Sequence, residues 1–84
     1  MSIEEIVLEE ITGFVDGATL VVIGKVRIED NIRNNLGIDS VEEIEIIMNL
    51  ERRLKIAVPD AKAERIKTVG DVVKLIEECV KKAV

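Results

Sequence analysis

The apolar residues of segment 41–54 constrain the fold of this chain more than any other feature, because they recur at the period of an α-helix. On a helical wheel of about 100° per residue, four of them cover one arc of roughly 100°, the width of a core-facing stripe. These four are Ile46, Ile47, Leu50 and Leu54. We therefore predict a helix over residues 41–54 that packs into the core along this arc.

A second apolar group lies on the same predicted helix, outside the core-facing arc. Val41, Ile44 and Met48 fall roughly 160–220° around the wheel from Ile46. A chain of 84 residues has room for one modest core, so burying both arcs is difficult. The pattern indicates either a helix packed on two sides or an exposed contact surface.

The five residues 36–40, Leu-Gly-Ile-Asp-Ser, lead from an irregular segment into this helix. Ser40 and Glu43 have the spacing of a capping box, which predicts that Ser40 begins the helix with a hydroxyl that can face solvent. Taken alone, this pattern indicates only a helix cap.

The N-terminal third starts with a second capping-box spacing, Ser2 and Glu5. An apolar stripe follows at Ile3, Val7, Ile11 and Phe14 and predicts a first helix that ends between residues 13 and 17. Residues 16–35 contain turn signals and no clear partner for a strand, so we expect a long loop that could include a short helical turn. Its apolar residues are expected to fold onto the helices, with Ile28, Ile32 and Leu36 holding its second half to the core.

Two further helices are predicted in the C-terminal part. A short one follows Pro59 over residues 61–66, and a longer one begins at Thr68, with Asp71 three residues on. Cys79 lies on the apolar stripe of the last helix, which favours a buried, unreactive thiol. The expected fold is all-α: residues 1–84 form a single domain, a small four-helix bundle of three main helices plus one short helix, with a long loop after the first.

Composition excludes several classes of function. The chain has no histidine, which removes His-based catalysis and the commonest zinc sites, and we expect neither an enzyme nor a metal site. A net charge of -5 and a single aromatic residue, Phe14, disfavour nucleic acid. No run approaches the roughly 20 apolar residues that span a bilayer, so membrane insertion is not expected. One cysteine allows no internal disulfide, consistent with a reducing, cytoplasmic location.

The middle of the chain resembles the acyl carrier proteins. Residues 36–41 read L-G-I-D-S-V and are followed by the acidic and apolar residues of that family's second helix. Residues 58–60, V-P-D, resemble the family's "IPD", and residues 63–69, A-E-R-I-K-T-V, resemble "AEKITTV". The likeness covers residues 36–76, about half of the chain, without a gap. The short motif gains specificity because the later motifs are in register with it.

This resemblance implies a function for Ser40. In the family, a phosphopantetheinyl transferase joins 4′-phosphopantetheine from coenzyme A to this serine, and the thiol of the arm carries acyl groups as thioesters. Asp39 would then help to position the metal and coenzyme A during transfer. The carrier would be monomeric and would present acyl intermediates of fatty acid or related lipid or polyketide biosynthesis to partner enzymes through its second helix. The residues expected to contact the transferase and the acyl-processing enzymes are Val41, Glu42, Ile44, Glu45, Met48 and Glu51.

Some residues depart from the family pattern. Asn35 stands where an aspartate is usual, Val41 replaces the usual leucine, and Arg52 and Arg53 stand where acidic residues are common. These differences weaken the acidic surface and favour a specialised carrier serving a dedicated pathway. A peptidyl or aminoacyl carrier and an unmodified helical docking subunit remain alternatives.

Overall fold

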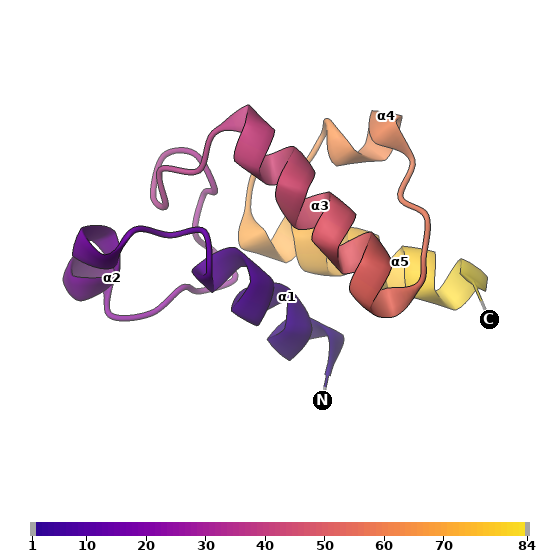
Figure 1. Cartoon of the computed structure of the whole chain (residues 1–84), viewed down its shortest axis with the longest axis horizontal. Helices are drawn as coiled ribbons and strands as arrows, with labels where there is room; N and C mark the ends of the chain where they lie inside the picture. Colours follow the sequence, from indigo (N-terminus) through magenta and orange to yellow (C-terminus); the bar gives the residue numbers. More distant parts are fainter. Residues whose placement is uncertain (1, 84) are drawn as a thin grey trace.

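The computed structural model describes residues 2–83, and within this range the regular structure is helical. The helices are α1 (Ile3–Thr12), α2 (Gly17–Ile23), α3 (Ser40–Leu54), α4 (Asp60–Ala63) and α5 (Val69–Ala83). Helix α1 packs against both α3 and α5, α4 packs against α5, and α2 lies at one end of the molecule (Figure 1). The all-α prediction is confirmed.

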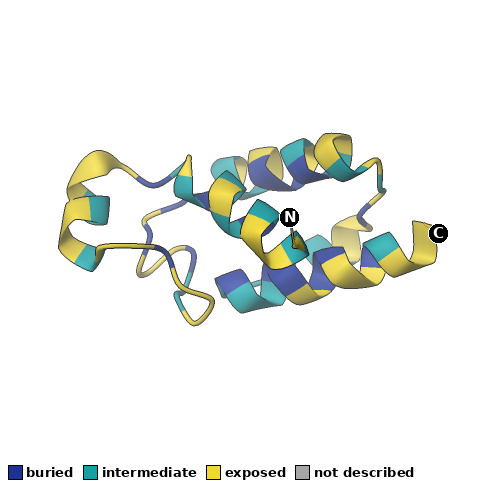
Figure 2. Cartoon of the chain, turned by 90° about the horizontal axis from the view of Figure 1, so that it is seen from below, coloured by how far each residue is buried: buried dark blue, intermediate teal, exposed yellow. Residues whose placement is uncertain are grey.

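The core is built from aliphatic residues, most of them in α1, α3, α5 and the connection before α3. Figure 2 colours the buried positions of these segments dark blue. The predicted inner face of α3 is confirmed, because Ile46, Ile47 and Leu50 are buried and Leu54 is half-buried. Phe14 is also only half-buried, so the core depends on branched aliphatic residues. The most completely buried side chains are Val7, Ile11, Ile32, Leu36, Ile38, Leu50, Val69, Val72 and Ile76.

Helix α1 begins as predicted. The Ser2 hydroxyl accepts a hydrogen bond from the Glu5 backbone N–H at 3.1 Å, and the Ser2 N–H donates to the Glu5 carboxylate at 3.2 Å. This reciprocal pair satisfies two N–H groups that the first turn would otherwise leave open. Val7 and Ile11 are completely buried on the inner face, which confirms the predicted stripe.

The connection after α1 differs from the expected loop, because it contains the seven-residue helix α2. Asp16 caps this helix by accepting the Thr19 N–H at 2.9 Å, and Gly24 ends it with φ of 82°. The bundle therefore has one helix more than the four predicted, in the connection where the sequence allowed a short helical turn. The expectation that all apolar residues here fold onto the core is also wrong, since Val21 and Val22 are 85% and 84% exposed.

The second half of this connection is tied to the start of α5. The Ile32 N–H donates to the Lys67 carbonyl at 2.9 Å, and the Gly70 N–H donates to the Ile28 carbonyl at 2.7 Å. Ile32 and Leu36 are buried as expected, whereas Ile28 is 44% exposed because only its backbone takes part in the contact. This attachment holds the segment that leads into α3.

The C-terminal helices follow the predictions, except that α4 is shorter than expected. Helix α4 ends at Ala63 rather than near residue 66. The Thr68 hydroxyl accepts the Asp71 N–H at 3.1 Å, and the Asp71 carboxylate accepts the Thr68 N–H at 3.0 Å, so the predicted cap of α5 is confirmed. Cys79 is buried in α5, also as predicted. No helix in the described range could cross a membrane, since none is both long and apolar enough.

Candidate functional site

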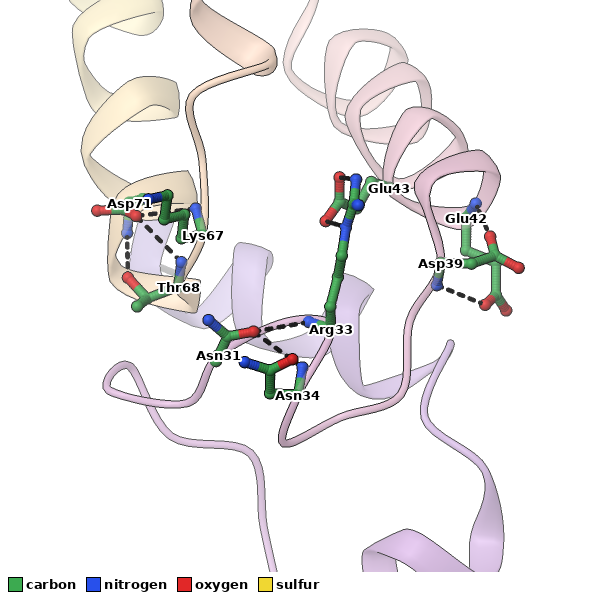
Figure 3. Close-up of polar contacts among 9 residues, drawn as sticks. All are labelled: Asn31, Arg33, Asn34, Asp39, Glu42, Glu43, Lys67, Thr68 and Asp71. Carbon is green, nitrogen blue, oxygen red and sulfur yellow. Dashed lines mark hydrogen bonds and ion pairs between the residues drawn. The ribbon is translucent and has the colours of Figure 1, made fainter.

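The N-terminus of α3 is capped by Asp39, and Ser40 is the first residue inside the helix. The Asp39 carboxylate accepts the Glu42 N–H at 2.8 Å, and the Asp39 N–H donates to the Glu42 carboxylate at 3.2 Å (Figure 3). The predicted Ser40–Glu43 capping box is therefore wrong by one residue. The physical reason is that the backbone is extended at Asp39, with ψ of 176°, and becomes helical at Ser40.

This shift changes what Ser40 contributes. Because Asp39 supplies the cap, the Ser40 hydroxyl is not needed to start the helix. Ser40 is exposed, so the hydroxyl lies on the surface at the positive end of the helix dipole. A surface hydroxyl in this position can be modified without removing a contact that holds α3 in place.

The loop before Asp39 is rigidly organised. The Asn31 side-chain oxygen accepts the backbone N–H groups of Arg33 and Asn34 at 3.0 and 2.8 Å (Figure 3). The Asn35 side chain in turn accepts the Asn31 N–H, which gives this departure from the family pattern a structural role. Gly37 has φ of 68°, a left-handed conformation that glycine adopts without strain. These contacts fix the approach of the chain to Ser40.

A groove of about 490 Å³ runs along α3 from Ser40. Its lining includes α3 residues from Ser40 to Glu51, a distance of about 16 Å at the helical rise of 1.5 Å per residue. The opposite wall comes from the segment around α4. Its apolar lining consists of Ile44, Ile47, Met48, Val58, Ala63 and Ile66. The groove therefore begins at the surface hydroxyl of Ser40 and continues between apolar side chains.

An ion pair lies at the serine end of this groove. The Arg33 Nε and Nη2 atoms donate to the two Glu43 carboxylate oxygens at 3.2 and 3.3 Å (Figure 3). The hydrogen bond with Glu43 raises the pKa of Arg33, the Glu43 charge raises it further, and the Asp39 charge adds a smaller contribution. The guanidinium therefore bonds the Glu43 carboxylate one helical turn after Ser40. The pair joins residues ten positions apart, and no local pattern in the sequence indicates it.

The second apolar arc of α3 is exposed, so this helix is not packed on two sides. Val41, Ile44 and Met48 are 62%, 60% and 50% exposed and make an uncovered strip on α3. The exposed Glu45 lies on the same helix. Glu51 is half-buried and accepts the Val58 N–H at 2.8 Å, so part of its carboxylate holds the connection to α4.

The arginines near the end of α3 contact the fold itself. Arg53 forms ion pairs with Glu9 and Glu10 of α1 at 3.2 and 3.4 Å. Asn49 also donates to Glu10, at 3.1 Å, and Arg52 donates to Asn49 at 2.9 Å. Arg53 and Asn49 thus connect α3 to α1, whereas Arg52 bonds within α3. The contact with α1 accounts for the positive charge of Arg53.

Comparison with known proteins assigns the class and then the family. Residues 9–76 match the family model described as "Phosphopantetheine attachment site", which defines a class of proteins that carry 4′-phosphopantetheine. The chain is also 44% identical over 77 residues to the acyl carrier protein of Prochlorococcus marinus (strain MIT 9515), covering 92% of this chain and 95% of the relative. The chain belongs to the acyl carrier protein family.

The residues of the site fit this group. The exposed Ser40 hydroxyl offers an attachment point, the Arg33 guanidinium can face a phosphate, and the groove offers apolar walls. When attached, phosphopantetheine supplies the thiol on which a carrier holds acyl groups as thioesters. The protein is thus a carrier rather than an enzyme, with 4′-phosphopantetheine as its prosthetic group.

Proposed function

We propose that Ser40 is the attachment point of 4′-phosphopantetheine and that residues 1–84 act as one monomeric acyl-carrier domain. One observation carries this proposal: the Ser40 hydroxyl is exposed at the start of α3, and Asp39 takes over the cap. The groove that starts at Ser40 supports it further, because the arm and its cargo would have an apolar surface beside the point of attachment.

The attachment is a transfer reaction that a separate phosphopantetheinyl transferase would catalyse. The Ser40 Oγ attacks the phosphorus on the pantetheine side of the coenzyme A pyrophosphate. An Oγ–P bond forms, the bond to the bridging oxygen breaks, 3′,5′-ADP leaves, and a base takes the hydroxyl proton. Asp39 would help to position Mg²⁺ and the coenzyme, and the N-terminus of α3 favours the negative charge of the resulting phosphodiester.

Intact-mass measurement of the apo protein with coenzyme A, Mg²⁺ and a transferase tests the attachment. Wild type is expected to gain one phosphopantetheine, and S40A is expected to gain none. The chain has one other serine, Ser2, so S2A is the matched control and is expected to be modified like wild type. Modification of S40A, or none of wild type with several transferases, would contradict the proposal.

We further propose that partner enzymes, the transferase included, bind the exposed strip of Val41, Ile44 and Met48 together with the carboxylates of Glu42, Glu45 and Glu51. Aromatic, apolar and arginine side chains dominate the energy of such interfaces, and opposite charges around them steer association. The attraction would therefore weaken as salt is added.

The substitution I44S tests this surface, with V22S as the matched control. Both residues are exposed, 60% and 84%, so neither change removes a core contact. A central interface side chain contributes about 1 kcal/mol or more, so I44S is expected to raise the transferase KM about fivefold or more. V22S on α2 is expected to leave it unchanged. Equal effects of the two substitutions would refute the assignment.

The pathway is proposed to be fatty acid or related lipid or polyketide biosynthesis, with this chain as a specialised carrier. The pairing of Arg53 with α1 supports a helix surface less acidic than the family's common pattern. Elongation of acyl chains on this protein by housekeeping ketoacyl synthases, at the rate seen with a standard carrier, would contradict specialisation. Loading by aminoacyl-activating enzymes instead of acyl-activating ones would favour a peptidyl carrier.

A further inference from the structure

The ion pair between Arg33 and Glu43 lies within reach of the Ser40 hydroxyl. Ser40 and Glu43 are three residues apart on α3, so they share one helix face with Cβ atoms about 5–6 Å apart. The Arg33 guanidinium bonds both oxygens of the Glu43 carboxylate, and Arg33 and Ser40 line the same groove. The cation is therefore placed about one helical turn from the proposed attachment point.

The charges around Ser40 make this cation important after modification. A phosphodiester at Ser40 would add a negative charge beside Asp39, Glu42 and Glu43, which are already acidic. Among the described residues that line the groove, Glu51, Asp60 and Glu64 are also acidic, and Arg33 supplies the positive charge. Like charges at such short range repel, so a nearby cation would stabilise the modified protein.

We propose that Arg33 binds the phosphodiester once Ser40 is modified, exchanging its bonds to Glu43 for bonds to phosphate oxygens. The planar guanidinium matches carboxylate and phosphate equally well, because both accept two parallel N–H bonds. Arg33 would thus act as a positioning residue that holds the attachment end of the arm. This inference rests on the proposed attachment at Ser40.

Little of the structure has to move for this exchange. The Arg33 side chain is 61% exposed and is free to turn, whereas the Glu43 side chain is only 14% exposed, so the bonds to phosphate must also offset the loss of this partner to a mostly buried carboxylate. The backbone of Arg33 is held on both sides, because its N–H donates to the Asn31 side chain (Figure 3) and its carbonyl accepts the Gly37 N–H at 3.2 Å. The proposed exchange would involve a rotation of the Arg33 side chain toward Ser40, which lines the same groove.

NMR of the full chain in its apo and phosphopantetheine-bearing forms tests the exchange. The Arg33 Nε–H resonance is expected to move when the arm is attached. E43Q is expected to shift this resonance in the apo form and to lose that effect in the modified form. In the modified protein, R33Q is expected to shift the ³¹P resonance of the phosphodiester. R27Q removes the same charge from the same connection and is expected to leave the ³¹P resonance unchanged.

The proposal is overturned if R33Q leaves the ³¹P resonance at its wild-type position, or if E43Q shifts the Arg33 signal equally in both forms. Intact mass separates this failure from failure of the proposed function. If wild type gains no phosphopantetheine, the attachment and this inference both fall. If it is modified at Ser40 and Arg33 does not respond, only this inference falls.

Discussion

The division of roles between Asp39 and Ser40 predicts opposite outcomes for two neighbouring substitutions. In D39A, α3 loses a cap made of two reciprocal hydrogen bonds, of 2.8 and 3.2 Å. Loss of an N-cap side chain costs about 1 kcal/mol, which corresponds to a decrease in Tm of about 4–8 °C for a domain of this size. In S40A, an exposed hydroxyl that caps nothing is removed, so the free energy of unfolding is expected to change by less than about 0.5 kcal/mol.

Urea unfolding followed by far-UV circular dichroism measures both changes on the apo proteins. D39N is the matched control, because asparagine caps helices about as well as aspartate. D39N is expected to unfold like wild type but to accept phosphopantetheine more slowly, since it lacks the charge proposed to position the metal. If S40A lowered stability as much as D39A, the hydroxyl would be part of the cap and the reasoning would be refuted.

Two further predictions concern backbone conformation and pH. G37A places a side chain at φ of 68° and is expected to lower the free energy of unfolding by about 1–2 kcal/mol. G17A is the control and is expected to change this free energy little, because Gly17 has open space around it and no positive φ. Equal urea midpoints for the two variants would contradict the prediction. The pKa of Asp71 is lowered because its carboxylate accepts the N–H groups of Thr68 and Lys67. The Asp71 carboxyl thus binds its proton more weakly in the folded state than in the unfolded state. Ionised Asp71 therefore stabilises the fold above its unfolded pKa of about 3.9, and this stabilisation is lost as the pH falls through the lower pKa of the folded state. D71N is expected to flatten the acid limb of stability against pH, and an unchanged limb in urea titrations would contradict the assignment.

The main helices could be predicted because their signals are local. In α1, the cap and the stripe of Val7 and Ile11 lie within ten residues, and the inner face of α3 follows from side-chain spacing alone. The exposure of Val41, Ile44 and Met48 could be stated only as one of two alternatives. Whether a second arc is covered depends on where other helices pack, which spacing does not encode.

The position of the cap shows how a local signal can be ambiguous. Asp39 with Glu42 and Ser40 with Glu43 both have the capping-box spacing. The choice between them depends on the chain before α3, where Ile38 is buried and Gly37 takes a left-handed conformation. Burial of Ile38 sets the direction in which the chain enters the helix.

The sequence indicated at most a short helical turn where α2 lies, because the interior of this helix is rich in β-branched residues, which have weak helix propensity. Its caps, Asp16 and Gly24, were visible as turn residues and could have indicated a short helix between them. Leu20 and Ile23 pack on the core and supply the tertiary contacts that a seven-residue helix requires.

Burial of Cys79 has a consequence for the cargo. A thioester can pass to any accessible thiolate, so a second reactive thiol on the surface would accept acyl groups from the arm and strand them. Cys79 is the only cysteine of the chain; it lies on α5, faces the core and is 7% exposed. The fold therefore offers an acyl group on the arm no accessible cysteine thiol to which it could pass within the described part of the chain.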